Sequence, residues 1–413
     1  MRAWTSPDLP RLPGAGDALR LHDTSSGSTK VAARAPDATM YVCGITPYDA
    51  THLGHAATYL AFDLVNRYWR DAGLQVTYVQ NVTDIDDPLL ERADATGVNW
   101  LQLAEEQTQL FREDMAWLRI LAPEHFVGAV EFIPQIVELI QALEPTGAMY
   151  DVDGDRYFDV SADQTFGSVS GMGRAEMVGL SAERGGDPQR PGKRDALDPL
   201  LWKAAAEGEP WWQSPLGPGR PGWHVECSAI ALSHLGAGFD VQAGGDDLVF
   251  PHHEMSASHA HVATGKPPFA QSYVHAGMIG LDGQKMSKSQ GNLVLASSLR
   301  EQGEDPRVVR LALMAGHYRA YREWNQELLD ASRQRLRRWE RAAAAGHRNG
   351  DASVVAHVRA RLADDLDTLG VLEVLDRWAE DTLSAAGTGT AQEDVEPGVV
   401  VQAVDALLGI DLR

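Results

Sequence analysis

The sequence predicts an α/β protein built on an open parallel sheet, and three observations indicate that fold class. Residues 39–79 read as strand, helix and strand, a spacing that is typical of two parallel strands joined by a crossover helix. A second stretch of alternating strands and helices occupies residues 223–278. The chain has 413 residues, of which 44% are hydrophobic, so it can bury the cores of about two or three domains.

Each element follows from the spacing of apolar residues and from the Gly and Pro residues that interrupt it. The expected strands are residues 39–42, 75–79, 239–242 and 272–278, and the expected helices are residues 55–72, residues 223–235 and a helix from His252 onward. Beyond about residue 304 the pattern is helical, with Trp324, Leu328, Leu336 and Trp339 on one face of a long helix.

The pattern divides the chain into six parts. We expect an N-terminal extension over the surface at 1–38, the first half of the α/β domain at 39–120, an inserted connective region at 121–210, the second half at 211–300, a stem-like helical connection at 301–340 and a C-terminal helical domain at 341–413. In the insertion, the Gly-rich segment 167–173 resembles a phosphate loop but lacks a lysine, so we interpret it as a turn.

Four segments each follow a predicted strand directly: Cys43, residues 81–83, residues 244–247 and Ile279. In an open parallel sheet, ligands bind outside the carboxyl ends of the strands. These segments are therefore expected to meet in one crevice, although they are far apart in the sequence.

Composition narrows the function classes. Lys and Arg number 36 and Asp and Glu number 58, giving a net charge of −22 that is poorly suited to gripping a polyanion. Cys43 and Cys227 are the only cysteines, which excludes a disulfide framework and indicates a reducing, cytoplasmic location. No apolar run is long enough for a membrane span, and the N-terminal residues lack the apolar core of a secretory signal.

Two short motifs indicate phosphate chemistry. His52-Leu-Gly-His55 lies where a loop enters a helix, a place where backbone N–H groups and the helix dipole attract phosphate. The motif Lys285-Met-Ser-Lys288-Ser follows about 230 residues later, and its two ammonium groups suit a departing pyrophosphate. The alternative is a pair of core histidines and a solvated Lys/Ser turn. The two motifs together resemble the signatures of class I aminoacyl-tRNA synthetases.

Further segments resemble cysteinyl-tRNA synthetases within that class, namely 198–203, 221–228 and 244–254. The resemblance implies a Rossmann-like catalytic domain, ATP with Mg²⁺ as substrate, and one zinc ion bound by Cys43, Cys227 and His252. Two thiolates and an imidazole are good zinc ligands and leave one position open. A substrate thiolate fills that position far better than a hydroxyl, so we expect L-cysteine as the amino acid.

The same resemblance implies the residues that contact the nucleotide and the activated amino acid. His52, His55, Lys285 and Lys288 are the expected catalytic residues. The expected adenylate pocket consists of Cys43, Gly44, Ile45, Thr46, Thr58, Asn81, Val82, Thr83, Trp223, Gly245, Asp246, Asp247 and Ile279.

The chain departs from cysteinyl-tRNA synthetases beside the expected metal. Those enzymes carry a glutamate ligand four residues after the position of His252, where this chain has Ser256. Glu254 cannot replace it, because residues two apart on a helix point in different directions. His259 shares a helix face with His252 and is a conceivable fourth ligand, and His253 is expected to have a structural role at the helix start.

A second departure concerns the C-terminal region. Residues 351–413 contain four Arg and no Lys against 13 Asp and Glu, which would repel a tRNA backbone. The basic run 333–341 is interpreted as a solvated helix face. Segments 43–51 and 183–188, together with Ser256, resemble the actinobacterial cysteine ligases of mycothiol biosynthesis.

That resemblance implies ligation of L-cysteine to the amine of glucosaminyl-inositol through a cysteinyl-adenylate, by a monomer without tRNA or membrane partners. A cysteinyl-tRNA synthetase and an inactive zinc- and nucleotide-binding relative remain the alternatives.

Overall fold

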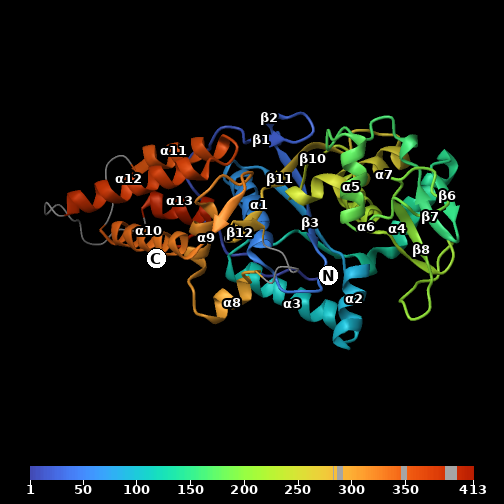
Figure 1. Cartoon of the computed structure of the whole chain (residues 1–413). Coiled ribbons are helices and arrows are strands. Elements are labelled where there is room, and N and C mark those ends of the chain that lie inside the picture. The colour runs from blue at the N-terminus through green and yellow to red at the C-terminus, as the bar shows by residue number, and fades with distance from the viewer. Residues whose placement is uncertain (282, 286–291, 346–350, 387–397) are drawn as a thin grey trace.

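A five-stranded parallel sheet forms the centre of the molecule, as the sequence predicts (Figure 1). Its strands run in the order β11 (Ala270–Ala276), β10 (Phe239–Gly245), β3 (Asp37–Ile45), β4 (Gln75–Val82) and β5 (His125–Gly128). The computed structural model describes residues 1–281, 283–285, 292–345, 351–386 and 398–413. Because β3 lies in the middle, its carboxyl end is flanked by those of β10 and β4.

The first strand–helix–strand unit has strands that are buried on both faces of the sheet. Residues 38 and 40–43 of β3 are all buried, and β3 pairs with β4 from Asp37 opposite Gln75 to Val42 opposite Gln80. Helix α1 (Leu53–Asp71) joins the two strands and begins at His52, whose Nδ1 accepts a hydrogen bond from the Gly54 N–H. The apolar spacing that predicts this helix therefore reflects a helix buried against the sheet.

The second unit agrees with the prediction except at its edges. Helix α6 spans Trp223–Leu235 as expected, whereas β10 continues to Gly245 and β11 ends at Ala276. Helix α7 (Glu254–Thr264) starts two residues later than expected. A π-helical turn, Val249–His253, precedes it. Phe250 takes an extended conformation within this turn, because Pro251 sterically disfavours the α conformation in the residue before it.

The N-terminal segment, which we expected to lie over the surface, contributes a hairpin whose first strand is partly buried. Strands β1 (Arg20–Asp23) and β2 (Ser28–Val31) pair antiparallel, and Leu19 and Leu21 are buried. The backbone N–H of Thr24 donates to the Tyr273 carbonyl on β11 at 2.8 Å, and the buried Asp23 accepts from the Tyr273 N–H. The hairpin is thus fastened to the edge strand of the central sheet.

The inserted region forms a second sheet at one end of the molecule (Figure 1). Its antiparallel strands are β6 (Met149–Val152), β7 (Asp155–Phe158), β8 (Leu200–Ala204) and β9 (Gly219–Pro221). Four helices lie between β4 and β8 in the chain: α2 (Asp87–Thr96), α3 (Trp100–Trp117), α4 (Ala129–Leu143) and α5 (Arg174–Glu183). The composition of this region, rich in Gly and charge, concealed its strands from the sequence analysis.

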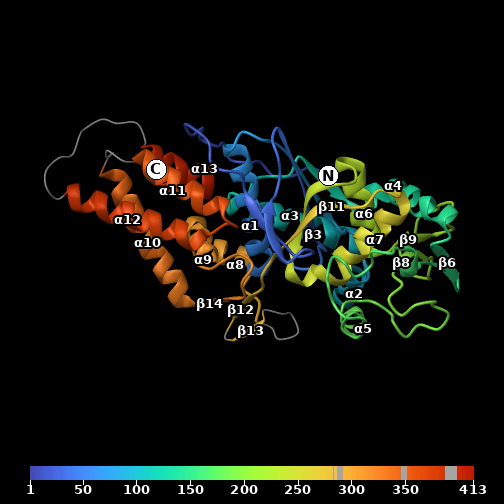
Figure 2. The same ribbon diagram turned by 90° about the horizontal axis from the view of Figure 1, so that it is seen from above.

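The opposite end is helical, as predicted (Figure 2). A small sheet of β12 (Ile279–Leu281), β13 (Gln284–Lys285) and β14 (Arg322–Trp324) precedes it. The helices are α8 (Ala296–Glu301), α9 (Pro306–Met314), α10 (Gln326–Ala344), α11 (Asp351–Ala363), α12 (Thr368–Ala386) and α13 (Val399–Leu408). Across the described residues, no helix combines the length and apolar character that spanning a membrane requires.

A buried ion cluster joins the central sheet region to the C-terminal helices. The Asp63 carboxylate on α1 accepts from Arg67 at 2.7 Å, from Arg310 on α9 at 2.6 Å and from the Leu121 N–H at 2.8 Å. Burial would raise the pKa of Asp63, but the two guanidinium groups hold it below its ordinary value. Arg67 and Arg310 also donate to backbone carbonyls of Asp405 and Leu408, so the cluster fixes α13 as well.

Replacing Asp63 with Asn is expected to cost about 3–5 kcal/mol in the free energy of unfolding, because two buried guanidinium groups lose their carboxylate. Urea denaturation at neutral pH measures the loss. The control is Glu113→Gln, which removes an exposed partner of Arg300 and should cost less than about 1 kcal/mol. The Asp63 contribution is present above the unfolded pKa of about 4 and disappears as the pH falls through the lower folded pKa. Equal losses for both variants would contradict this interpretation.

Candidate active site

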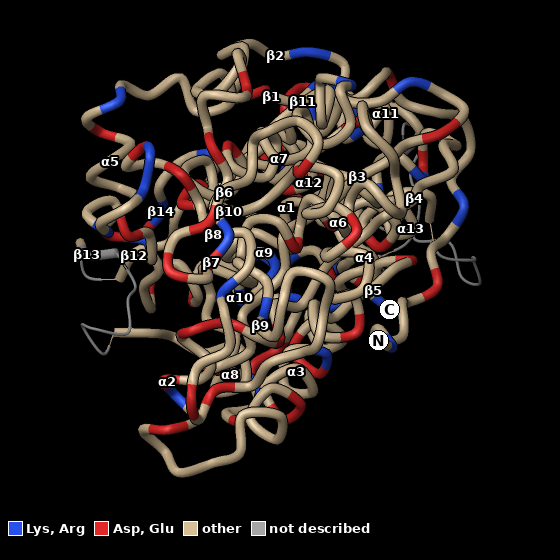
Figure 3. The backbone as a smooth tube through the Cα atoms, turned by 90° about the vertical axis from the view of Figure 1, so that its right-hand side faces the viewer, with Lys and Arg blue, Asp and Glu red and all other residues tan. Residues whose placement is uncertain are grey.

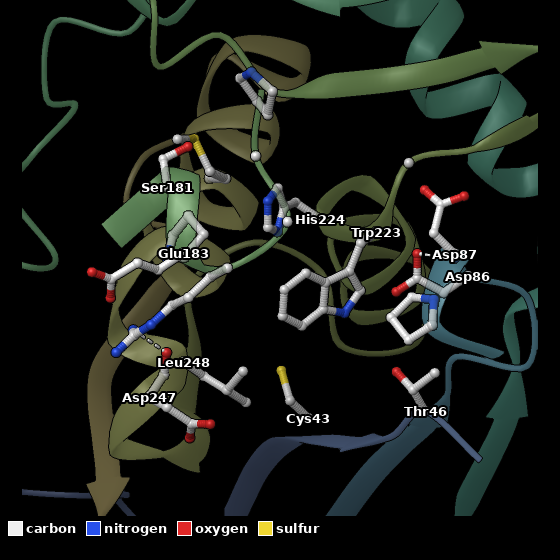
Figure 4. Close-up of a pocket in the computed structure, with 18 of the residues that line it drawn as sticks. Cys43, Thr46, Asp86, Asp87, Ser181, Glu183, Trp223, His224, Asp247 and Leu248 are labelled. Atoms are coloured by element: carbon white, nitrogen blue, oxygen red, sulfur yellow. Dashed lines mark hydrogen bonds between the residues drawn. The ribbon is translucent and has the colours of Figure 1, made fainter. Parts of the chain in front are cut away.

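A cavity of about 950 Å³ opens at the carboxyl end of the central sheet (Figure 4). It lies between the first strand–helix unit, the second unit and the insertion. Of the residues expected from the sequence, those that line it are Cys43, Gly44, Ile45, Thr46, His52, His55, Thr58, Trp223, Gly245 and Asp247. Of the four strand-end segments expected to meet in one crevice, Cys43 and the 244–247 segment line this cavity, whereas residues 81–83 and Ile279 do not.

The loop after β3 is held from behind by residues expected to line the cavity. Asn81 accepts from the Gly44 N–H at 2.8 Å and donates to the Thr83 hydroxyl at 3.1 Å. A Cβ at Gly44 would lie only 1.6 Å from the Asn81 carbonyl oxygen, so this approach requires glycine. Asn81, Val82 and Thr83 are buried and do not line the cavity, so here they support the loop.

The two motif histidines lie together at the start of α1. Their rings stack with centroids 3.8 Å apart, and both line the cavity. His52 forms a β-bridge with Leu295, which brings the chain after the second motif against the first motif. Lys285 lies on β13, paired with Gly280, and Lys288 lies outside the described residues.

Three of the expected residues form a cluster suited to a metal ion. Ligand atoms of Cys43, Cys227 and His252 all lie within 4.8 Å of one another, and the three residues are buried. His252 Nε2 is 3.2 Å from the Cys227 sulfur. Two soft thiols and one imidazole, converging without a carboxylate, fit a tetrahedral zinc site with one position left for another ligand.

The sulfur atoms of the cluster influence one another. Burial opposes ionisation of Cys227, yet contact with the Cys43 thiol and the His252 ring lowers its pKa well below the ordinary value. Burial and the neighbouring Cys227 sulfur raise the pKa of Cys43 well above its ordinary value. One thiolate is thus favoured before any metal binds, and a metal would ionise the second.

A series of hydrogen-bonded, mostly buried side chains supports the Cys43 sulfur, and no sequence motif indicates it. The sulfur is 3.2 Å from His253 Nε2 and 3.3 Å from the Gln242 amide nitrogen. His253 Nδ1 is 2.7 Å from His275 Nε2, and His275 Nδ1 is 2.7 Å from the Thr24 hydroxyl. A thiolate accepting from His253 fixes the tautomers of both rings, with Thr24 donating at the far end.

The side wall of the cluster is aromatic. The Trp223 ring stacks on His252 with centroids 4.4 Å apart and an interplanar angle of 24°. Trp223 and His224 line the cavity, and His224 Nδ1 is 3.0 Å from His252 Nδ1. The Trp223 indole therefore covers His252, which does not itself line the cavity, and Figure 4 shows the indole beside His224 and above Cys43.

The residues considered as further ligands have other roles in this structure. The Ser256 hydroxyl donates to the His224 carbonyl at 3.1 Å. The His259 ring packs edge-on against Phe158, outside the cluster of three. Glu254 points away, as predicted, and accepts from the N–H groups of Gly167, Val169 and Ser170 at 2.7–3.1 Å. The Gly-rich turn therefore binds a carboxylate of its own chain.

The remaining predicted adenylate residues divide between the cavity and its support. Thr58 lines the cavity, and its hydroxyl donates to the Gly54 carbonyl at 3.1 Å. Asp246 opens a short 3₁₀ turn, Asp246–Leu248, and does not line the cavity. Ile279 is buried on β12, and the preceding residues Gly277 and Met278 line the cavity in its place.

The fold and the two motif loops define a class I synthetase catalytic domain. The family model described as tRNA synthetases class I (C) catalytic domain matches residues 30–334, and the chain belongs to this family. Mycobacterium tuberculosis methionyl-tRNA synthetase, solved with methionyl-adenylate, is similar in fold with a TM-score of 0.64 at 17% identity, covering 90% of this chain and 92% of that one.

Curated relatives are much closer in sequence. Proteins from Thermomonospora curvata and Streptomyces griseus, each named L-cysteine:1D-myo-inositol 2-amino-2-deoxy-alpha-D-glucopyranoside ligase, are 59% and 57% identical. A Mycobacterium marinum protein of the same name is 56% identical. All three matches cover 100% of both chains.

Replacing His253 with Ala should weaken zinc binding by about 10–100-fold, because the Cys43 thiolate loses a hydrogen-bond donor. Competition with a chromophoric chelator measures the affinity. The matched control is His259→Ala, another buried histidine near the cluster, which should leave the zinc affinity unchanged. The interpretation is wrong if both variants bind zinc as the wild type does.

Proposed function

We propose that this protein joins L-cysteine to the amine of glucosaminyl-inositol, which is 1D-myo-inositol 2-amino-2-deoxy-alpha-D-glucopyranoside. ATP activates the cysteine carboxylate as a cysteinyl-adenylate and releases pyrophosphate. The sugar amine then forms the amide and releases AMP. The observation that carries the proposal is the Cys43–Cys227–His252 cluster in a chain that matches the named ligases along its full length. Its Cys43 lines the same cavity as the motif histidines His52 and His55.

The donor set accounts for selection of cysteine. Zinc held by Cys43, Cys227 and His252 supplies one open position for a soft thiolate ligand, which the serine hydroxyl fills poorly. The Trp223 indole, stacked on His252, closes one side of the space in which the substrate sulfur lies. A hydrophobic pocket alone discriminates near-isosteres by only about a hundredfold, so the ligand chemistry is the stronger filter.

The motif residues serve the activation step in this proposal. His52 and His55, stacked at the N-terminus of α1, are placed to donate to the α-phosphate of ATP·Mg²⁺. Lys285 and Lys288 neutralise the departing pyrophosphate. Cys43–Thr46, Thr58, Trp223, Gly245 and Asp247 contact the adenylate directly, while residues 81–83, Asp246 and Ile279 position the contacting backbone.

Charge supports a small acceptor instead of tRNA. Arg333 on α10 pairs with Glu304, and Arg335 and Arg338 pair with Asp376 on α12. In the view of Figure 3, Lys and Arg are interspersed among Asp and Glu and do not gather in one stretch. These guanidinium groups are thus already paired with carboxylates of the same chain.

The domain division given above, a monomeric state and a cytoplasmic location remain part of the proposal. Zinc thiolates are suited to a reducing compartment. The two halves of the α/β domain carry the nucleotide chemistry, and the sheet of strands β6 to β9 closes the cavity. The expected insertion bounds of 121–210 shift, because β5 (His125–Gly128) belongs to the central sheet and β9 (Gly219–Pro221) to the insertion's sheet.

Incubating the protein with ATP, labelled cysteine and either glucosaminyl-inositol or tRNA tests the function. We expect a cysteinyl amide of the sugar by mass spectrometry, one AMP per amide, and no label on tRNA. Omitting the acceptor should leave cysteine-dependent exchange of pyrophosphate into ATP. Label on tRNA and not on the sugar would overturn the proposal.

Replacing Ser256 with Glu tests the charge of the metal site. Zinc with two thiolates and a neutral imidazole is formally neutral, so an added carboxylate should repel the substrate thiolate and raise the cysteine KM about tenfold, or about 1.4 kcal/mol. The control, Ser256→Gln, adds the same bulk without charge and should raise KM less. Equal KM values for the two variants would rule out the electrostatic explanation.

A further inference from the structure

The cavity extends beyond the adenylate residues to a wall supplied by the insertion. Six residues line this part of the cavity, and we call them together the acceptor wall: Tyr157, Asp187, Arg190, Lys193, Lys203 and Arg220. They come from β7, the loop after α5, β8 and β9, none of which carries a phosphate motif. This part of the cavity faces the start of α2, where Asp86 also lines it.

The cations of the acceptor wall are each paired with a carboxylate. Arg190 contacts Asp155 at 2.6 Å, and Lys193 contacts Asp187 at 2.8 Å. Lys203 and Arg220 both contact Asp87, and Arg220 also contacts Glu209. A wall of paired charges and a tyrosine offers many hydrogen bonds without net charge, which suits the hydroxyl groups of a sugar.

Asp86 differs from the wall in having no ion pair among the described residues. It precedes the first residue of α2, and one carboxylate oxygen accepts from the Asp87 N–H at 2.8 Å. Figure 4 places it beside Trp223 and above Thr46, and the next residue, Asp87, contacts Lys203 and Arg220 of the acceptor wall. The Asp86 carboxylate therefore lines the same cavity as Cys43 and Trp223 and is adjacent in sequence to the residue that pairs with the wall.

We propose that Asp86 is the group that receives the proton of the acceptor amine during amide formation, an inference that rests on the proposed function. As the amine nitrogen bonds to the carbonyl carbon of the adenylate, the nitrogen becomes acidic and its proton passes to the Asp86 carboxylate. The bond from that carbon to the phosphate oxygen breaks, and AMP leaves with the electron pair. Asp86 then returns the proton to water.

The charged surroundings of Asp86 suit this role. Burial, with the charge of Asp87, raises the pKa of Asp86 to about 6, while the Asp87 N–H, Arg220 on β9 and His252 oppose the rise. Glu226 on α6 is fully buried beside Asp86, and burial together with the charge of Asp86 raises the pKa of Glu226 well above its ordinary value. A general base works best when its pKa lies near the working pH.

Asp86→Asn is the test, since Asn caps a helix about as well as Asp and removes only the proton acceptor. We expect cysteine-dependent pyrophosphate exchange within about twofold of wild type and sugar transfer from preformed cysteinyl-adenylate slower by at least about a hundredfold. Wild-type transfer should fall below about pH 6 as Asp86 becomes protonated, and the variant should lack that decline. The acceptor amine also titrates, but it does so equally with the wild type and with the variant, so the difference between the two pH profiles reports on Asp86.

The control is Asp94→Asn, the same change at an exposed position of α2, which should leave both steps unchanged. Three results for Asp86→Asn would each overturn the inference. They are an equal loss of pyrophosphate exchange and sugar transfer, an unchanged rate of sugar transfer, and a decline of transfer near pH 6 like that of the wild type. If wild-type protein makes no sugar amide at all, the proposed function fails instead, and the two failures are therefore distinguishable.

Discussion

The close approach of Cys43, Cys227 and His252 is the interaction on which the rest of the site depends. The three residues come from the end of β3, from α6 and from the turn before α7. Parallel pairing of β3 with both β4 and β10 places the first residue, and packing of α6 on α7 places the others. A metal–sulfur bond tolerates changes of only about 0.2 Å, so the register of the central strands is a condition of metal binding as well as of stability.

The support of this cluster explains why the N-terminal hairpin is part of the domain. Thr24 follows β1 and reaches the Cys43 sulfur through His275 and His253. Its backbone is also hydrogen-bonded to β11. A residue near the beginning of the chain thereby orients a ligand at the centre of the sheet. Burial lowers the pKa of both histidines, so both are neutral, as a directional chain of donors and acceptors requires.

The central elements were predictable because their burial imposes a regular spacing of apolar residues on the sequence. The strands of the insertion could not be predicted, because they are short. Strands β6 to β9 contain only three to five residues each, too few for alternation to stand out from the Gly-rich and charged segments around them. The three metal-ligand candidates came from the resemblance to cysteinyl-tRNA synthetases, because Cys43 and Cys227 are too far apart in the sequence for spacing to reveal a metal site. The resemblance does not distinguish a residue that lines the cavity from one that supports it, which is why Asn81 and Thr83 were expected to line the cavity.

The His253–His275–Thr24 chain could not be found from the sequence, because its members are 22 and 251 residues apart and no motif links them. The acceptor wall presents the same difficulty in another form. No sequence motif links Lys203 and Arg220 to a carboxylate, yet folding places Asp87 in contact with both, although it is 116 and 133 residues away. Pairing converts a basic surface that would attract phosphate into a neutral polar one. In the proposed function, contacts between the insertion and α2 set the acceptor preference, while the motifs of the sheet set the nucleotide chemistry.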